Sequence, residues 1–361
     1  MAKVTVIGAG VMGSALTIPL SDNGHRVALC GTEFDRAIIE SCLAGRSHPG
    51  LGARLPGSVQ PFHIGDLERA LMDADIVVIG VISRAVGKIT RKIAPFLSPG
   101  ITIVNAAKGL EESASGHLRT LPEIIATSLP QGRREHIAVV AIGGPSKALE
   151  LASRHVTCVV FASEQSGRLD QCIEIFATNY YHIWPTTDVL GVEVCAAIKN
   201  GFAIGVGISD GLAERISPSS PATTMDNLRS AVFNQAVYEM KALTQAFGGR
   251  PETVYGLAGL GDLYVTCRQG RNVTLGRLLG QGHSCAEAME LMKGATVEGI
   301  EAIRAVRKAI KALEMKGEAK CDDFPLLNHL YSVLFEEAPV CLEIDKFFDS
   351  QRKQAMGKVT L

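Results

Sequence analysis

The sequence Val4-Thr-Val-Ile-Gly8-Ala-Gly10-Val-Met-Gly13 decides the fold of this chain. Its first four residues are β-branched and predict a buried strand, and the residues after Gly13 repeat apolar positions at helical spacing. A Gly-x-Gly-x-x-Gly turn between a strand and a helix lets the backbone bend tightly and approach a pyrophosphate at the positive end of the helix. We therefore predict a dinucleotide-binding loop, rather than a merely structural turn, formed by Gly8, Gly10, Val11, Met12 and Gly13.

Outward from this loop, apolar runs rich in Val and Ile alternate with helical patterns as far as residue 187. The predicted strands are Lys3–Ile7, Arg26–Cys30, Ile76–Ile82, Ile101–Asn105, His136–Ile142, Val156–Ala162 and Tyr181–Trp184. Strands that alternate with helices are typical of a doubly wound parallel sheet with helices on both faces. This pattern predicts an α/β fold whose N-terminal domain, residues 1–187, is of the Rossmann type.

Helical patterns dominate the remainder, which predicts an all-α second domain over residues 188–361. The predicted helices are Val189–Gly211, Asn227–Phe247, Ser284–Lys293, Val297–Met315 and Pro325–Phe335. The Pro- and Ser-rich segment Glu214–Thr224 interrupts the pattern, and we expect an exposed loop there.

The composition excludes several classes of protein. A net charge of -1 over 361 residues predicts neither a nucleic-acid surface nor a membrane surface. The 9 cysteines form no Cys-x-x-Cys pair and no Cys/His cluster, so we expect reduced thiols and no metal site. No apolar run reaches the roughly 18 residues that a membrane span needs. We expect a cytoplasmic protein without an integral membrane segment.

The end of the second predicted strand bears on which dinucleotide is bound. A carboxylate there favours the free ribose hydroxyls of NAD, whereas an Arg favours the 2′-phosphate of NADP. Glu33 lies 20 residues beyond Gly13, and Asp35 follows it, but Arg36 is close. The cofactor is therefore predicted to be NAD or NADP, with a slight preference for NAD.

Four further segments carry a resemblance to a known family. They are Asn105-Ala-Ala-Lys108-Gly109, Gly144-Pro145-Ser146, Gly191-Val-Glu193-Val-Cys-Ala-Ala-Ile-Lys199-Asn200 and Gly256-Leu-Ala-Gly-Leu-Gly-Asp262-Leu-Tyr-Val-Thr266-Cys-Arg-Gln-Gly-Arg271-Asn272. With the glycine loop, these segments resemble the NAD(P)-dependent glycerol-3-phosphate dehydrogenase family in order and spacing over nearly the whole chain.

The resemblance implies a reaction and a set of site residues. It implies a homodimeric oxidoreductase that interconverts dihydroxyacetone phosphate, a small phosphorylated ketone, and sn-glycerol 3-phosphate, for phospholipid synthesis. The implied catalytic residues are Lys199, Lys108, Asp262 and Thr266. The implied substrate ligands are Lys108, Asn200, Arg271, Asn272 and Ser146, and the further cofactor ligands are Glu33, Lys108, Arg271 and Glu298.

The chemistry explains why these residue types are needed. Reduction of a ketone requires a hydride for the carbon and a proton for the oxygen, on which negative charge develops. Lys199 is the implied proton donor, and it interrupts the small, apolar segment Cys195–Ile204, where an unpaired charge is costly. Arg271 offers a planar fork of donors that matches phosphate oxygens. Asp262 is expected to orient Lys199.

The chain also departs from the family pattern. Asn227 and Arg229 match it, whereas Met225 and Leu228 replace its usual Gly and Thr, and Lys147 replaces an apolar residue. These changes leave substrate breadth open. The alternatives are a dehydrogenase for a different small phosphorylated ketone or a β-hydroxyacid, and a non-catalytic dinucleotide sensor.

Overall fold

The computed structural model describes residues 1–112, 118–216 and 225–349, which fold into two compact units. The first unit comprises Met1–Glu111 and Arg119–Glu193, and the second comprises Glu112–Leu118 and the chain from Val194 onward. The border between the units falls inside helix α9 (Val189–Ile216).

An eight-stranded sheet forms the centre of the first unit, in the order β10-β9-β8-β5-β4-β1-β2-β3. Its strands are β1 (Lys3–Ile7), β2 (Arg26–Cys30), β3 (Val59–Phe62), β4 (Ile76–Ile79), β5 (Thr102–Asn105), β8 (Ala138–Gly143), β9 (Thr157–Ala162) and β10 (Tyr181–Thr186). The predicted Rossmann-type sheet is confirmed, and the run from β3 to β8 is parallel.

The last two strands differ from the predicted all-parallel sheet, because β9 pairs with β8 in the antiparallel sense and β10 runs parallel to β9. A parallel partner requires a crossover that returns the chain along the full length of the strand. The connection from β8 to β9 contains only α7 (Ala148–Ala152), a helix too short to carry the chain back.

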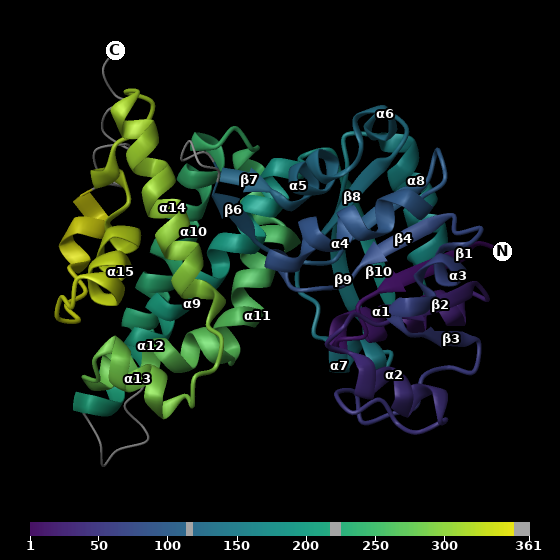
Figure 1. Ribbon diagram of the computed structural model, residues 1–361. Coiled ribbons are helices and arrows are strands. Elements are labelled where there is room, and N and C mark those ends of the chain that lie inside the picture. Colours follow the sequence, from purple (N-terminus) through teal and green to yellow (C-terminus); the bar gives the residue numbers. More distant parts are fainter. Residues whose placement is uncertain (113–117, 217–224, 350–361) are drawn as a thin grey trace. The chain divides into compact units, whose positions relative to one another are not determined.

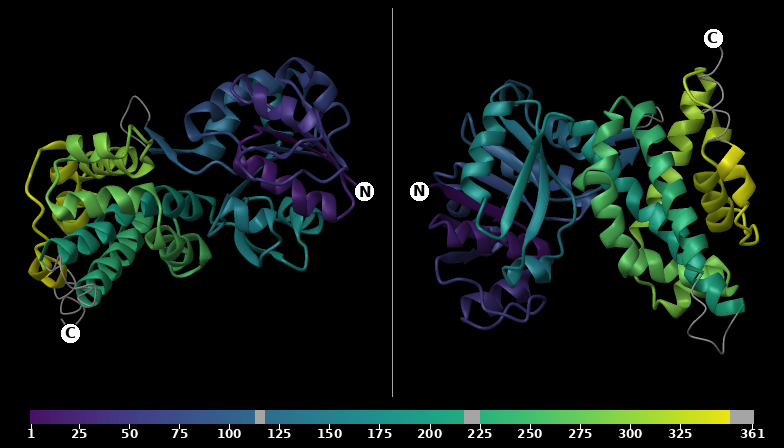
Figure 2. Two further views of the ribbon diagram at one scale, coloured as in Figure 1. Left: turned by 90° about the horizontal axis from the view of Figure 1, so that it is seen from below. Right: turned by 180° about the vertical axis from the view of Figure 1, so that it is seen from behind.

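Helices cover both faces of this sheet (Figures 1 and 2). One apolar core joins the sheet to α1 (Val11–Asp22), α2 (Arg36–Leu43), α7 and α8 (Ser166–Phe176). A second core on the other face joins it to α3 (Leu67–Leu71), α4 (Val86–Ile93) and α5 (Leu121–Ser128). Along β1, Val4 and Val6 enter the first core and Ile7 enters the second, as the two-residue repeat of a strand requires. Strands β6 (Leu110–Glu112) and β7 (Leu118–Thr120) form a separate two-stranded sheet, and the short helix α6 (Gln131–Arg134) belongs to the first unit.

The second unit consists mainly of helices. Besides most of α9, they are α10 (Asp226–Ala246), α11 (Asp262–Arg268), α12 (Arg271–Gln281), α13 (Cys285–Leu291), α14 (Glu298–Met315) and α15 (Pro325–Phe335). Glycines let α9 and α12 approach at backbone distance: a Cβ added at Gly276 would lie 2.0 Å from the carbonyl oxygen of Ile204. This contact brings the start of α12 beside the residues of α9 that the sequence analysis singled out.

Helix α9 runs further than predicted. Of the expected loop Glu214–Thr224, residues 214–216 continue the helix, and residues 217–224 lie outside the described part of the chain. Helix α9 has the length and apolar composition of a membrane span, and 83% of its most apolar window is buried inside the protein.

Candidate active site

The glycine loop has the geometry that a pyrophosphate site needs. Gly8 has a φ of +104°, and a Cβ there would lie 2.6 Å from the carbonyl oxygen of Gly80. A Cβ on Gly13 would lie 2.2 Å from the carbonyl oxygen of Gly8, so α1 starts close against the loop. Gly10 precedes α1, and a Cβ there would meet nothing within 4 Å. The loop is therefore closed on its protein side and open where a dinucleotide would approach.

A pocket of about 260 Å³ lies beyond the end of β2. It is lined by Thr32, Glu33, Arg36, Ile39, His63 and Ile64. Its place at the end of β2, beside the glycine loop, is where doubly wound folds hold the adenosine half of a dinucleotide. The residues present therefore fit the predicted cofactor at both its pyrophosphate and its adenosine ends.

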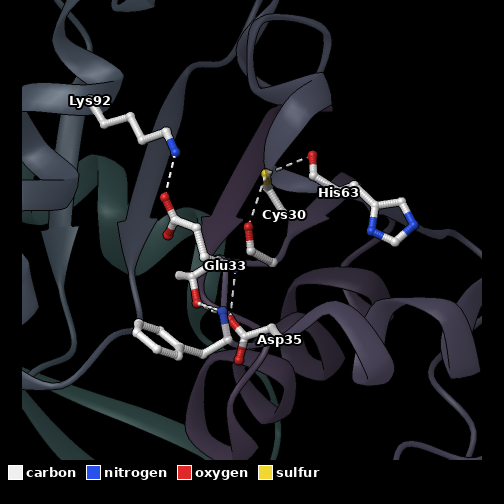
Figure 3. Close-up of polar contacts among 8 residues, drawn as sticks. Cys30, Glu33, Asp35, His63 and Lys92 are labelled. Atoms are coloured by element: carbon white, nitrogen blue, oxygen red, sulfur yellow. Dashed lines mark hydrogen bonds and ion pairs between the residues drawn. The ribbon is translucent and has the colours of Figure 1, made fainter.

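The two carboxylates beside this pocket point in different directions (Figure 3). Glu33 Oε1 accepts a hydrogen bond of 2.7 Å from Lys92 Nζ, and this bond lowers the pKa of Glu33. Asp35 Oδ2 instead accepts from the backbone N–H and the hydroxyl of Thr32, both at 2.8 Å, and from the N–H of Ala9 at 3.2 Å. Asp35 therefore ties the loop after β2 to the glycine loop.

Lys108 lies just beyond the end of β5. The turn before it is held by Asn105, whose Nδ2 donates to the carbonyl oxygen of Ala107 and whose Oδ1 accepts from the N–H of the same residue. Lys108 Nζ donates to the carbonyl oxygen of Gly144, just beyond the end of β8, at 2.7 Å. Ser146 Oγ lies 3.9 Å from Met12 Sδ on α1. The carboxyl ends of β1, β5 and β8 thus bring these predicted residues to one edge of the sheet.

Glu193 is a fully buried carboxyl group that the sequence analysis did not assign. Its Oε2 accepts from the N–H of Leu121, the first residue of α5, at 3.1 Å. Burial raises the pKa of Glu193 to about 8. The hydrogen bond from Leu121 and, to a smaller extent, the charge of Lys108 lower this pKa. No pattern in a single sequence distinguishes such a glutamate from the other charged residues of a helix.

In the second unit, Lys199 and Asp262 form a buried ion pair, with 7% and 4% of their side chains exposed. Lys199 lies on α9, and Asp262 begins α11 directly after the π-helical turn Leu257–Gly261. Turns of this type are frequent at functional sites. Thr266 Oγ donates to the carbonyl oxygen of Asp262 at 2.7 Å, one helical turn earlier. A lysine ammonium is thus held by a carboxylate among apolar residues.

The start of α12 meets α9 and α14 through Asn272. Its Nδ2 donates to Asn200 Oδ1 at 3.0 Å, and its Oδ1 accepts from the N–H of Gly299 at 2.9 Å. Next to it, Arg271 pairs with Glu298 at 2.5 Å, and both side chains are about half exposed. Asn272 therefore joins three helices, while the guanidinium of Arg271 stays at the surface of the unit.

The predicted residues divide between the two units. The glycine loop, Glu33, Lys108 and Ser146 belong to the first unit; Lys199, Asn200, Asp262, Thr266, Arg271, Asn272 and Glu298 belong to the second. Within the described part of the chain, no group of three or more His, Cys, Asp or Glu side chains has the geometry to hold a metal ion.

Comparisons with known proteins agree with this arrangement. The family model for the NAD-dependent glycerol-3-phosphate dehydrogenase N-terminus matches residues 3–168, and that for the C-terminus matches residues 188–344. The NADP(+)-dependent glycerol-3-phosphate dehydrogenase of Archaeoglobus fulgidus is 40% identical over 92% of this chain and 95% of its own length. A glycerol-3-phosphate dehydrogenase [NAD(P)+] of Bacillus cereus is 32% identical over 93% of this chain and 92% of its own.

Solved structures show the same fold. The glycerol-3-phosphate dehydrogenase of Coxiella burnetii is 29% identical, with a TM-score of 0.75 over 98% of both chains. The enzyme of Saccharomyces cerevisiae, 24% identical, has a TM-score of 0.79 over 97% of this chain and 99% of its own. This chain belongs to the NAD-dependent glycerol-3-phosphate dehydrogenase family.

Proposed function

We infer that this chain is an NAD(P)-dependent glycerol-3-phosphate dehydrogenase, which reversibly reduces dihydroxyacetone phosphate to sn-glycerol 3-phosphate. The buried Lys199–Asp262 ion pair is the observation that carries this inference, in a chain whose two halves match the two family models. A sensor of dinucleotides has no need for a lysine held at this depth, whereas a ketone reductase needs a proton donor shielded from water.

Each side chain has a role in the proposed mechanism. A dinucleotide held by the glycine loop would supply the hydride for the carbonyl carbon of the substrate. Lys199 Nζ gives a proton to the carbonyl oxygen as negative charge develops there, and in the reverse direction its neutral amine accepts the hydroxyl proton. Asp262 holds the Lys199 ammonium in place, and Thr266 fixes the helical turn that carries Asp262. Lys108 binds the substrate and polarises its carbonyl.

The phosphate of the substrate is assigned to Arg271. Its guanidinium is about half exposed at the start of α12, and its fork of donors matches phosphate oxygens. Asn272 contributes mainly by holding this helix start, because its side chain already binds Asn200 and Gly299. Glu298 faces Arg271, where we assign it to the cofactor.

For the cofactor we propose that both dinucleotides are accepted, with NAD preferred. Glu33 lines the pocket beyond β2 and supports the preference, since its carboxylate can accept from ribose hydroxyls, while Arg36 in the same pocket permits NADP. Glu33→Gln is expected to lower the ratio of kcat/KM for NADH over NADPH by about tenfold, the value of one charged hydrogen bond. The control is Glu68→Gln, an exposed carboxylate on α3. An unchanged ratio would remove Glu33 from the site.

We propose a homodimer in the cytoplasm that supplies glycerol phosphate for phospholipid synthesis, with a cofactor domain over residues 1–187 and a helical domain over residues 188–361. No disulfide joins the nine cysteines, all of which lie in the described part of the chain, and this supports a reducing compartment. Light scattering measures the size of the assembly, and limited proteolysis locates the domain boundary.

The test of the function is the rate of NADH and NADPH oxidation with dihydroxyacetone phosphate, dihydroxyacetone and a β-keto acid. Strong turnover with the phosphorylated ketone alone is the expected result. A preference for the keto acid would reassign the chain to the β-hydroxyacid dehydrogenases. Bound cofactor without turnover of any of the three would indicate a sensor.

A further inference from the structure

The peptide groups on either side of Ala9, between the first two glycines of the loop, are held by side chains from elsewhere. Ala9 is fully buried, and its carbonyl oxygen lies 2.9 Å from His48 Nε2. The same oxygen accepts a longer hydrogen bond, 3.3 Å, from Ser14 Oγ on α1. The Ala9 N–H donates to Asp35. None of these contacts belongs to the glycine motif itself.

The other contacts of His48 identify which ring nitrogen carries the proton. His48 Nδ1 accepts from the N–H groups of Gly50 and Leu51, both at 3.1 Å, so its lone pair faces two donors. In the neutral ring the proton then resides on Nε2, which donates to Ala9. The ring is fully buried, and it links the loop after α2 to the glycine loop through one donor and one acceptor.

The hydrogen bond from His48 Nε2 to Ala9 also determines the orientation of the next N–H group, because the peptide bond is planar. A trans peptide is planar, so the carbonyl of Ala9 and the N–H of Gly10 point in opposite directions. Because His48 holds the carbonyl, the N–H of Gly10 is turned away from His48, and a Cβ at Gly10 would meet nothing within 4 Å. This open side, at the start of α1, is where the pyrophosphate approaches.

We propose that His48 is a positioning residue for the cofactor, acting through the Ala9–Gly10 peptide, with Asp35 holding the preceding peptide. The proposal rests on the cofactor site inferred above. Without the Nε2 donor, this peptide can rotate, and its N–H is no longer fixed toward the pyrophosphate. Loss of this donor should weaken the binding of ligands that contain a pyrophosphate and should not change the binding of the phosphorylated ketone.

Two substitutions separate the functions of the two ring nitrogens. His48→Gln places an amide N–H near the position of Nε2 and keeps the donor to Ala9. His48→Asn places an amide oxygen near the position of Nδ1 and keeps the acceptor for Gly50 and Leu51, but it lacks the donor. His25→Asn is the matched control: His25 Nε2 lies 3.1 Å from the carbonyl oxygen of Ile175, and Nδ1 accepts from Ala2 at 3.2 Å, away from the glycine loop.

The affinities for NADH, ADP-ribose and adenosine are measured by titration calorimetry, together with kcat and KM for both substrates. His48→Asn is expected to weaken NADH and ADP-ribose about tenfold, the value of one buried hydrogen bond, with adenosine affinity, kcat and the KM for dihydroxyacetone phosphate unchanged. His48→Gln and His25→Asn are expected to bind NADH like the wild type.

Wild-type NADH affinity in His48→Asn would overturn the proposal, as would equal losses for adenosine and ADP-ribose. Should His48→Asn fail to fold, His48→Gln decides alone: a tenfold loss of NADH affinity in that folded variant would show that the donor to Ala9 is not the relevant contact. Absence of NADH binding to the wild type would overturn the cofactor site itself, and the proposal with it.

Discussion

Replacing Lys199 by methionine removes the ammonium but keeps most of the side-chain volume, so its chemical and structural contributions can be separated. General acid catalysis contributes roughly a hundredfold to ten-thousandfold, so we expect kcat for dihydroxyacetone phosphate to fall about a thousandfold, or about 4 kcal/mol. The role proposed for Lys199 is proton transfer and includes no contact with the dinucleotide, so the affinity for NADH should be unchanged.

The same substitution leaves Asp262 as a buried carboxylate without its ammonium partner, and both side chains are less than a tenth exposed. Removal of one member of a buried pair costs about 3–5 kcal/mol, a large part of the roughly 5–15 kcal/mol that stabilises a protein. At roughly 2–4 °C per kcal/mol, the melting temperature should fall by roughly 10 °C.

The double variant Lys199→Met/Asp262→Leu distinguishes the two effects, because replacing both members of a buried pair by apolar side chains is often neutral for stability. Stopped-flow NADH oxidation and scanning fluorimetry measure the two quantities. The double variant should regain most of the melting temperature but none of the activity. A single variant that retains kcat within tenfold, or a double variant that recovers kcat, would refute the role of Lys199 as proton donor.

Two further predictions concern the phosphate and the pH dependence of stability. Arg271→Ala is expected to raise the KM for dihydroxyacetone phosphate about a hundredfold, because charged hydrogen bonds to the phosphate are lost. The weak rate with unphosphorylated dihydroxyacetone should be unchanged. Equal losses with both ketones would contradict the assignment of Arg271 to the phosphate. Burial raises the pKa of Glu239 to about 7, although hydrogen bonds from Gln235, Leu326 and Leu327 to the carboxylate lower it. Because the folded state binds this proton more tightly than the unfolded state, its contribution to stability is present below about pH 4.5 and is lost as pH rises through about 7. Glu239→Gln should therefore flatten the melting temperature between pH 5 and pH 8, roughly the range set by this shift, and a parallel curve for variant and wild type would exclude Glu239 as the source.

The sequence predicted the parts of the fold that depend on local patterns. The bounds of β1, β2 and α15 were predicted as they are found, because short apolar runs mark the two strands and a proline in the first turn marks the helix. Strand β3 was missed because Val59-Gln-Pro-Phe62 is short and contains Pro61, which edge strands tolerate.

The end of α9 shows why a glycine can mislead. The helix was predicted to stop at Gly211, but it continues to Ile216. A Cβ on Gly211 would lie 2.0 Å from the carbonyl oxygen of Arg277, so this glycine is required by the packing of α12 rather than by a break in the helix. Only the partner helix explains it, and a local pattern contains no information about that partner.

The residues of the site also fall into two groups, those that sequence motifs predict and those that only the tertiary fold explains. The family motifs pointed to Lys199 and Asp262, and the structure places the two in an ion pair. His48 and Glu193 were not predicted, because their partners Ala9 and Leu121 lie 39 and 72 residues away in the chain. Contacts of this range depend on the tertiary fold, and neither residue type stands out by its neighbours.

The backbone contact between α9 and α12 has a consequence for substrate size. Lys199 lies on one of these helices and Arg271 at the start of the other, and glycines such as Gly276 bring the two helix backbones into contact. In the proposed roles, the spacing of the helix positions that carry the proton donor and the phosphate anchor thus depends on these main-chain contacts. Substitutions around the rim can change which groups surround a substrate, whereas a larger side chain at one of these glycines would push the two helices apart and change the distance that a substrate has to bridge.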